Sequence, residues 1–526
     1  MDILLFNPYY SQTEKYYSYY RPAPPLGLLY LASYLEKNRL CCGVEELGVF
    51  TAKEALRIGT KIRFGISDTK IVEILRKERP KILGITCMYS IYFRDVLEIA
   101  ATVKKEAPDI KIILGGNHAS SYWRQVIKNQ CVDYIVIGEG EETFLELCNK
   151  LINGSDVSKI KGIAFRDENG QAVINKHREF ISDLDTIPFP AYNKIDFKRY
   201  LSEGNPFAMR FPVVGIVSSR GCPGDCVYCT VKAVWGRTWR GRSSKNVVDE
   251  IEYLYNTYSI REIAFLDDSA SVDRKRWEDI CEEIIRRKLD IKWTTPNGIA
   301  HWTLSNDLLN KMQMAGCYRI TFGIESGDPE TRKFLGKPYS LAQAKGLINH
   351  ANRIGMWSNC TNIIGFPYEK LGSIKKTISF AKECGTDFAC FFLLIPQPTS
   401  KVYQYFKHEG LLNFDAFFES DEYDEQGFEE INYVLNETGS DTLHFKKEEL
   451  GLLQKQAYRS FIIHRALSYI FHPWRLLRKI HSFEESRYIL RLVTRGVRIF
   501  FRTLNPMNKK SSDYLYENTK TTVGET

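Results

Sequence analysis

The chain has 526 residues, of which 44% are hydrophobic and 26% are charged, and its formal net charge at pH 7 is +8. This length is too great for one hydrophobic core and predicts two or three domains, while the apolar content excludes a largely disordered chain. We expect neither a secretory signal nor a membrane span, because no basic start followed by an apolar run and no stretch of 18 apolar residues occurs. A reducing cytoplasm is therefore expected, where clustered cysteines indicate a metal or catalytic site rather than disulfides.

Residues 1–155 alternate short apolar runs with amphipathic stretches of helical period. Strands are expected at 2–8, 82–87, 111–117 and 133–141, and the alternation predicts a doubly wound parallel sheet. Turns rich in Gly, Pro or Asn end several of these runs and contain Asn7, Pro8, Gly115, Gly116, Asn117, Gly138, Glu139 and Gly140. Ligands of such sheets bind outside the carboxyl ends of the strands, so these turns are candidate cofactor contacts. The alternative is that each turn only ends its strand.

Residues 156–206 separate this region from a second alternating region. The segment around Glu168, Asn169 and Gly170 predicts a β-hairpin, and "DLDTIPFPAYNKIDF" after it is typical of a linker. From residue 211 the alternation resumes, with six apolar runs that begin at about 212, 261, 291, 318, 358 and 388. Six strands with helices outside them predict a closed or partly closed (βα)6 barrel over residues 207–430, with its chemistry at the carboxyl ends of the strands.

Three cysteines follow the first expected barrel strand, in the stretch "SSRGCPGDCVYCT". Cys222, Cys226 and Cys229 have Cys-x3-Cys-x2-Cys spacing. A structural zinc site needs four ligands, and no second Cys-x2-Cys or closely spaced pair of histidines lies nearby. Three thiolates on a four-iron, four-sulfur cluster leave one iron for a ligand that is not protein, which explains the missing fourth cysteine. The alternatives are a binding protein clipped by zinc and three buried thiols.

The motif, with aromatic Tyr228 before its last cysteine, resembles the signature of the radical S-adenosylmethionine superfamily. The resemblance implies that the open iron binds S-adenosylmethionine and that the cluster cleaves it to a 5′-deoxyadenosyl radical, which takes hydrogen from a substrate. It also implies an electron donor such as a flavodoxin or ferredoxin. Contacts to S-adenosylmethionine are then expected from Tyr228, Asp267, Asp268, Asn297, Glu325, Ser326, Gly365, Pro367 and Glu369.

Several of these positions have a plainer interpretation that the sequence leaves open. Asp267 or Asp268 is equally suited to cap the helix that follows. The run from Gly365 to Glu369 is equally suited to a turn that ends in a helix-start glutamate.

The N-terminal region resembles the cobalamin-binding domain that precedes the barrel in one large group of radical S-adenosylmethionine proteins. "RPAPPLGLLYLASYLE", "GGNHAS" and "DYIVIGEGEETF" carry this resemblance. It implies a corrin between the two domains, with its nucleotide tail in the doubly wound sheet. The Asp-x-His-x-x-Gly run of histidine-ligated cobalamin domains is absent. We therefore favour a lower cobalt face without a protein histidine. The alternative is that His118 is the cobalt ligand.

The pair of cofactors predicts methyl transfer to an unactivated carbon of a small-molecule or lipid-like substrate. In that reaction the radical removes hydrogen and cobalamin supplies the methyl group. The alternatives are radical cyclisation or rearrangement, with or without cobalamin.

Residues 431–526 are expected to form a helical, basic region with a disordered tail. Between Lys455 and Lys510 the chain has 13 Lys and Arg residues against two Glu, a net charge of +11. Arg487, Arg491, Arg495, Arg498 and Arg502 recur at helical spacing opposite aliphatic residues. This pattern fits a helix packed on the barrel with its arginines in solvent, or a helix that lies reversibly on a membrane surface. Nucleic acid is not expected as a partner, because no recognition motif accompanies the charge.

Overall fold

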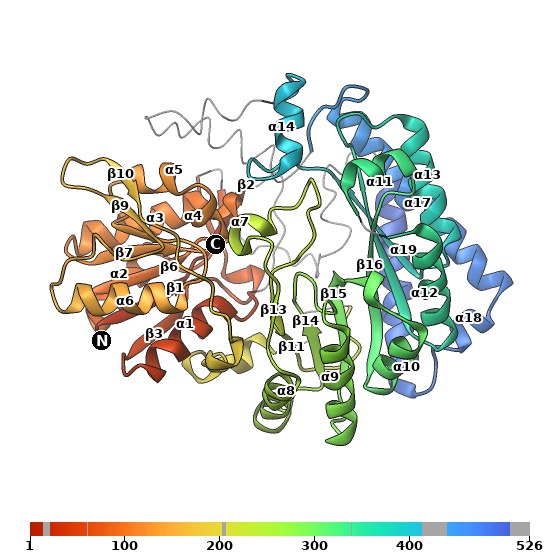
Figure 1. Ribbon diagram of the computed structural model, residues 1–526, viewed down its shortest axis with the longest axis horizontal. Coiled ribbons are helices and arrows are strands. Elements are labelled where there is room, and N and C mark those ends of the chain that lie inside the picture. The colour runs from red at the N-terminus through yellow and green to blue at the C-terminus, as the bar shows by residue number, and fades with distance from the viewer. Residues whose placement is uncertain (14–21, 60, 202–206, 338, 413–438, 505–526) are drawn as a thin grey trace.

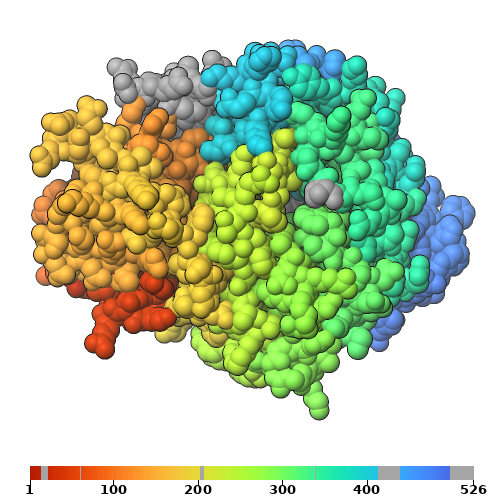
Figure 2. All heavy atoms as spheres, in the orientation of Figure 1, coloured from red at the N-terminus to blue at the C-terminus, as the bar shows by residue number. Residues whose placement is uncertain are grey.

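The computed structural model describes residues 1–13, 22–59, 61–201, 207–337, 339–412 and 439–504. An N-terminal α/β domain is followed by an open barrel and by C-terminal helices on the barrel side remote from that domain (Figure 1). The N-terminal domain packs directly against the barrel (Figure 2). The predicted fold class is confirmed. The boundary expected at residue 430 and the expected disordered tail lie outside the described residues.

The N-terminal sheet is built on five parallel strands in the order β3-β1-β6-β7-β8. They are β1 (Ile3–Asn7), β3 (Cys42–Glu46), β6 (Ile82–Thr86), β7 (Lys111–Gly115) and β8 (Tyr134–Val136). One face is covered by α1 (Leu26–Lys37) and α6 (Glu141–Ile152), and the other by α2 (Asp68–Glu78), α3 (Phe93–Glu106) and α5 (Trp123–Lys128). The sheet is therefore doubly wound, and its strand order reverses between β1 and β6, where such sheets bind ligands.

The predicted hairpin consists of β9 (Ile163–Arg166) and β10 (Ala172–Ile174). Because β9 pairs antiparallel with β8, the hairpin extends the N-terminal sheet. A small antiparallel sheet of β2 (Tyr10–Thr13), β4 (Leu56–Ile58) and β5 (Lys61–Phe64) was not predicted.

Six parallel strands form the barrel sheet, and their order in space is their order in the chain. They are β11 (Val213–Ile216), β14 (Glu262–Phe265), β15 (Lys292–Ile299), β16 (Cys317–Glu325), β17 (Trp357–Ile364) and β18 (Phe388–Leu393). The helices between them include α8 (Ser244–Tyr258), α9 (Arg274–Arg286), α10 (Asn306–Met314), α12 (Leu341–Arg353) and α13 (Leu371–Glu383). In the part of the chain that the structure describes, β11 and β18 are not paired with each other, so the barrel is partial as predicted.

Ser and Asp side chains start most of these helices. Ser243, Asp273, Ser305 and Ser340 each accept a hydrogen bond from the backbone N–H three residues further on. This satisfies a donor that the first turn leaves without an intrahelical partner. The cap of α9 is Asp273, so the alternative in which Asp267 or Asp268 caps this helix is wrong.

Helix α17 (Lys447–Phe471) covers the open edge of the sheet at β18. Tyr458 Oη accepts a hydrogen bond from the Phe391 backbone N–H at 3.1 Å, and Gln454 Nε2 donates to the Phe391 carbonyl at 2.6 Å. These side chains satisfy backbone groups that a neighbouring strand would otherwise bind, which protects the edge from other strands.

Helix α19 (Phe483–Leu504) follows the short α18 (Trp474–Leu477) and packs on the barrel. Its arginines do not all face solvent, contrary to the pattern expected for a packed helix. Arg491 donates to the carbonyls of Ala208 and Met209 at 3.0 and 2.9 Å, and the Arg495 guanidinium lies 4.4 Å from the centre of the Phe207 ring. No helix in the described ranges is long and apolar enough to cross a membrane.

Candidate functional site

The three predicted cysteines lie on one loop between two very short strands, β12 (Ser219–Arg220) and β13 (Arg240–Gly241), which pair antiparallel. Gly221 opens the loop with a φ of +85°, and a Cβ there would lie 2.1 Å from the Thr238 carbonyl oxygen. Only glycine fits this close approach.

Two of the three sulfur atoms of this loop lie close to each other. An added Cβ at Gly224 would lie 3.3 Å from Cys222 Sγ and 3.8 Å from Cys226 Sγ, so both sulfurs lie beside the same glycine. Burial raises the pKa of the Cys226 thiol, and it raises that of Cys229 to about 11. Both would lose a proton on binding iron, because thiolate is the metal-binding form. Across the described residues, no three His, Cys, Asp or Glu side chains form a group that could hold a single metal ion.

Asp267 and Asp268 follow β14 directly beside the cysteine loop. Asp267 Oδ1 accepts hydrogen bonds from Ser218 Oγ at 2.8 Å and Ser219 Oγ at 2.5 Å. Its Oδ2 is buried and makes no hydrogen bond among the described residues. Burial raises the pKa of both carboxyl groups. A carboxylate with one open, buried oxygen fits the ammonium of a ligand such as S-adenosylmethionine.

Glu325 ends β16 in a left-handed backbone conformation, with a φ of +64°. The pairing with β17 shifts register between Gly323 and Glu325, which indicates a bulge at this strand end. Glu325 is 6% exposed as a whole residue, and its carboxylate accepts a hydrogen bond from Lys337 Nζ at 3.0 Å. Lys337 Nζ lies 5.9 Å from the centre of the Tyr228 ring, so this ion pair lies close to the cysteine loop. A strained backbone held by a buried ion pair is typical of a functional position.

The other predicted contacts to S-adenosylmethionine are held mainly by protein groups. Asn297 Nδ2 donates to the Leu266 carbonyl at 2.9 Å, and Ser326 Oγ lies 3.1 Å from Thr377 Oγ1. Gly365, with a φ of +93°, donates its N–H to Glu369 Oε2 at 2.7 Å in the turn that contains Pro367. Burial raises the pKa of Glu369 to about 7, and its Oε1 has no hydrogen bond in the described chain.

Lys337, Tyr339 and His301 were missed by the sequence analysis. Tyr339 Oη donates to the Gly323 and Ile324 carbonyls at 2.5 and 2.6 Å, directly before the bulge. His301 is 1% exposed, its ring centre lies 4.0 Å from that of Tyr339, and neither ring nitrogen has a hydrogen bond among the described residues. No motif marks these positions, because they lie outside the strands and only the fold brings them to the strand ends.

The candidate cobalamin contacts lie at the carboxyl ends of β1, β7 and β8. Asn7, next to Pro8, donates to Glu46 Oε2 at 2.6 Å. At Gly115 an added Cβ meets no atom within 4 Å, so the space outside β7 is open. Gly116 has a φ of +105° and starts α4 (Asn117–Ser121). Of these positions, Gly115 therefore leaves room for a group outside its strand end.

His118 lies in α4 with its ring buried between aromatic side chains. The ring centres of Phe93 and Tyr122 are 4.5 and 4.8 Å away, and Nδ1 lies 2.8 Å from Ser90 Oγ. Burial lowers the pKa of His118 to about 3, so the imidazole is neutral. Its role as a cobalt ligand stays a prediction.

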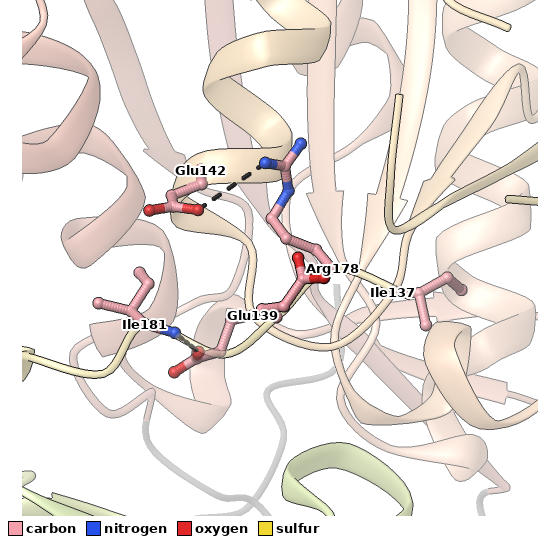
Figure 3. Close-up of a pocket in the computed structure, with 6 residues that line it drawn as sticks. Ile137, Glu139, Glu142, Arg178 and Ile181 are labelled. Carbon is pink, nitrogen blue, oxygen red and sulfur yellow. Dashed lines mark hydrogen bonds and ion pairs between the residues drawn. The ribbon is translucent and has the colours of Figure 1, made fainter. Parts of the chain in front are cut away.

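Glu139 is held by the barrel. It accepts hydrogen bonds from Arg220 and Arg240, the two residues that flank the cysteine loop. The cavity beside Glu139 measures about 10 Å³, which is room for one water molecule at most (Figure 3). The neighbouring Gly138 has a φ of +75°, and an added Cβ there would lie 3.3 Å from His177 Nε2. Whether Glu139, Gly138 or Gly140 contacts cobalamin stays a prediction.

Comparison with known proteins gives two matching family models and relatives that span most of the chain. Residues 216–381 match the radical SAM superfamily, where SAM is S-adenosylmethionine, and residues 18–148 match the B12 binding domain. An uncharacterized methyltransferase, PH0819, of Pyrococcus horikoshii is 30% identical over 481 residues, which cover 91% of this chain and 94% of that protein. The cytidylyl-2-hydroxyethylphosphonate methyltransferase of Streptomyces wedmorensis is 28% identical and covers 80% of this chain and 87% of its own.

Another relative and two solved structures complete the comparison. The anaerobic magnesium-protoporphyrin IX monomethyl ester cyclase of Rubrivivax gelatinosus is 27% identical, over 72% of this chain and 66% of that protein. The radical S-adenosylmethionine methyltransferase TsrM from Kitasatospora setae superposes with a TM-score of 0.63 at 18% identity, over 77% of this chain and 76% of that one. The cobalamin-dependent radical enzyme OxsB has a TM-score of 0.61 at 18% identity, over 96% and 72%. These two likenesses concern the fold.

Proposed function

The chain belongs to the radical SAM superfamily, in the group that carries an N-terminal B12 binding domain, and from this membership we propose that it methylates an unactivated carbon of a small molecule. A four-iron cluster, S-adenosylmethionine and cobalamin are its cofactors. When bound, they supply the radical that removes hydrogen and the methyl group that replaces it. The names of PH0819 and of the Streptomyces wedmorensis relative support methyl transfer.

The observation that carries this proposal is the contact between the two cofactor regions. Helix α7 (Val231–Trp235), inside the cysteine loop, contacts α4 of the B12 binding domain. A Cβ added at Gly138 would lie 3.8 Å from the Val234 carbonyl oxygen. The carboxyl ends of both sheets therefore face one junction, where a radical and a methyl donor can reach the same substrate.

Within that junction, this chain's residues have separate tasks. Cys222, Cys226 and Cys229 would hold the cluster, and the open Oδ2 of Asp267 would hold the ammonium of S-adenosylmethionine. Glu325, fixed by Lys337, would hold ribose hydroxyls. The turn at Gly115 and Gly116 would receive the cobalamin tail. Cyclisation, the activity named for the Rubrivivax gelatinosus relative, is the alternative reaction.

The test uses anaerobically reconstituted protein with S-adenosylmethionine that carries a deuterated methyl group. The protein is incubated with reductant and a small-molecule extract, and the products are analysed by mass spectrometry. Methyl transfer predicts 5′-deoxyadenosine together with a metabolite that gains the labelled methyl group. Formation of 5′-deoxyadenosine with a product that has lost hydrogen and gained no label would favour cyclisation and contradict the proposal.

We propose that an acidic electron-transfer protein, such as a flavodoxin or ferredoxin, docks over the cysteine loop. Asp225, between the first two cysteines, is surrounded by the basic groups of Lys401, Arg237 and Lys232. Three cations around one carboxylate give this surface a positive charge that suits an acidic partner.

We also propose that the enzyme is cytoplasmic and that it contacts a membrane surface reversibly through its C-terminal helices. Of the 25 exposed large hydrophobic side chains in the described residues, ten lie between residues 463 and 497. This C-terminal apolar face consists of Ile463, Leu467, Ile470, Phe471, Trp474, Leu477, Phe483, Leu490, Val493 and Val497. Such a high proportion of exposed apolar side chains is unusual for a surface that contacts only water.

Charge favours an anionic lipid surface as the partner of this face. Arg459 on α17, Arg478 directly after α18 and Arg487 on α19 are exposed. The two acids of the segment are turned to the barrel, since Glu484 pairs with Arg210 at 2.8 Å and Glu485 lies 3.5 Å from Lys292. Aromatic and aliphatic side chains with basic neighbours are the pattern of interfacial helices, and this placement suits a lipid-like substrate.

A further inference from the structure

We propose that Glu139 is a positioning residue that holds both ends of the cysteine loop against the B12 binding domain and thereby fixes the cluster relative to cobalamin. This inference rests on the proposed use of both cofactors at the junction. It assigns to Glu139 a task other than contact with a cofactor.

The cysteine loop is closed at its base by two arginines. Arg220 in β12 and Arg240 in β13 are direct cross-strand partners, and all three cysteines lie between them in the chain. Arg220 is separated from Cys222 only by Gly221, whose backbone is locked against Thr238. A displacement of Arg220 is therefore transmitted to the first cluster ligand.

Both arginines donate to the same carboxylate of the other domain. Arg220 Nη1 lies 2.8 Å from Glu139 Oε1, and Arg240 Nη1 lies 2.9 Å from each Glu139 oxygen. The linker contributes a third donor to the same carboxylate, because the Ile181 backbone N–H donates to Glu139 Oε2 at 2.9 Å (Figure 3). Glu139 thus joins three segments that are far apart in the sequence.

A second glutamate balances the charge of this cluster. Arg220 Nη2 donates to Glu141 Oε1 at 2.6 Å, so two carboxylates face two guanidinium groups. All four side chains are at most 10% exposed. A buried charge that loses its partner is costly, so neither arginine can move away from Glu139 without a penalty. The contact is therefore rigid. The cysteine loop requires this rigidity because it must hold its cluster in one place.

The geometry of the surrounding residues restricts the contact further. Arg240 also lies over the Phe180 ring, with the guanidinium carbon 4.8 Å from the ring centre. Glu139 itself follows Gly138, whose positive φ sets the direction in which the chain enters α6. The junction thus has little freedom on either side.

The test compares Glu139→Gln with a matched control, Glu142→Gln, in reconstituted full-length protein. Gln keeps the shape and one acceptor of Glu139 but removes its charge. Glu142 lies three residues away, its side chain is 43% exposed, and it lies 3.8 Å from Arg178. A second variant, Glu139→Gln with Arg240→Gln, restores neutrality and leaves the Arg220–Glu141 pair, so it remains informative if the single variant fails to fold.

Two readouts distinguish positioning from general stability. Pulsed electron paramagnetic resonance measures the coupling between cob(II)alamin and the reduced cluster, which reports their separation. Hydrogen–deuterium exchange of residues 176–182 and 219–241 in cobalamin-free protein reports the contact even if cobalamin is not used. In either Glu139 variant, we expect the iron content to stay within twofold of wild type. The exchange rate of both segments should rise at least tenfold, and the coupling should broaden. Glu142→Gln should show neither the faster exchange nor the broader coupling.

Two results would overturn the inference, and a third would overturn the proposed function instead. Unchanged exchange and unchanged coupling would show that the contact does not position the loop. Equal loss of iron, cobalamin and folded structure in both Glu139 variants would show a purely structural role. Absence of cobalamin from wild-type protein, with the exchange result intact, would overturn the proposed function and leave the domain contact in place.

Discussion

Glu325 and Lys337 form a 3.0 Å ion pair at the carboxyl end of β16, with side chains that are 8% and 10% exposed. Burial opposes the charge on Lys337, but Glu325 raises its pKa, so the ammonium stays charged. The pair also stabilises the left-handed backbone of Glu325, a conformation that costs roughly 1–2 kcal/mol. Glu325 is thereby presented to the junction in a fixed orientation.

We predict that Glu325→Gln raises the KM for S-adenosylmethionine by about tenfold or more, because a charge-assisted hydrogen bond contributes about 1.5–3 kcal/mol. The variant should also lose about 3 kcal/mol of stability, since Lys337 is left buried without its counter-ion. Formation of 5′-deoxyadenosine and thermal unfolding measure the two effects. Glu325→Gln with Lys337→Met should regain stability without regaining affinity. The exposed Glu330→Gln is the control, and an unchanged KM in Glu325→Gln would show that Glu325 is only structural.

Removal of any one thiol of the cysteine loop should prevent assembly of the cluster. In Cys222→Ala, Cys226→Ala or Cys229→Ala, we expect iron to fall from about four to below one per chain and cleavage of S-adenosylmethionine to vanish. The fold should persist, because all three side chains are only partly buried. Exposed Cys41→Ala is the matched control and should retain iron. Stoichiometric zinc in wild-type protein, without cleavage, would instead support the zinc-clip alternative.

Most strands of the two parallel sheets could be predicted, because a buried parallel strand has a short apolar sequence. Strand β3, "CGVEE" at 42–46, was not predicted, because it contains two glutamates and has no apolar run. The runs at 82–87 and 111–117 became β6 and β7, and all six barrel runs became strands in chain order. The small sheet of β2, β4 and β5 could not be predicted. Its strands are only three or four residues long, which is too short for the alternation in "LRI" at 56–58 and "KIRF" at 61–64 to identify a strand, and "YSQT" at 10–13 has no apolar pattern.

The candidate site was predictable where chemistry fixes spacing, as at the three cysteines. It was not predictable where the fold brings distant residues together. Lys337 pairs with Glu325 across 12 positions, and Glu139 meets Arg220 across 81. Helix α19 shows a related limit. Its sequence reveals two faces but not which one packs, and Arg491 proved to dock on the barrel while Leu490 is exposed.

The open space at Gly115 leads to a prediction about cobalamin. Gly115→Leu should fold like wild type, because the new Cβ meets no atom within 4 Å and the backbone is not in the left-handed region. The side chain would enter the space outside β7, so we expect corrin absorbance after gel filtration to fall at least tenfold. Gly372→Leu, at an equally open position in α13, should bind cobalamin normally. If Gly115→Leu keeps its full corrin content, the nucleotide tail of cobalamin does not bind next to Gly115.

Glu262 predicts a pH dependence of stability. Its buried carboxyl accepts from the Met209 and Arg210 N–H groups and from Tyr318 Oη, each at 2.7 Å. Burial raises its pKa from 4.5 to about 7, so the native state binds this proton more tightly than the unfolded state. The protonated Glu262 therefore adds about 3 kcal/mol to the free energy of unfolding. This contribution is complete below pH 4.5 and is lost as the pH rises through 7.

Glu262→Gln mimics the protonated carboxyl and should remove this dependence. The free energy of unfolding of wild type minus that of the variant should therefore fall by about 3 kcal/mol between pH 4.5 and pH 8. Urea titrations at several pH values, followed through tryptophan fluorescence, measure the difference. Glu330→Gln is again the control. A difference that stays constant with pH would contradict the raised pKa.

The C-terminal apolar face predicts selective binding to anionic lipid. On α19, Phe483, Leu490, Val493 and Val497 are 50–80% exposed, with Arg487 among them. Each basic side chain near an anionic leaflet contributes roughly 1 kcal/mol, so binding should be reversible and weakened by salt. We expect the protein to co-sediment with anionic liposomes at low salt, and much less with neutral liposomes or at high salt.

The variant Leu490→Gln with Val493→Gln and Val497→Gln should reduce this binding at least tenfold and leave the fold unchanged, because all three side chains point to solvent. Met314→Gln, at a 70% exposed position on α10, controls for the loss of surface apolar area elsewhere. Sedimentation equilibrium at the same concentrations measures whether a second copy covers the face instead. Equal binding to both lipid types, or a dimer that only the triple variant dissociates, would refute the membrane proposal, because the apolar face would then serve contact between protein chains.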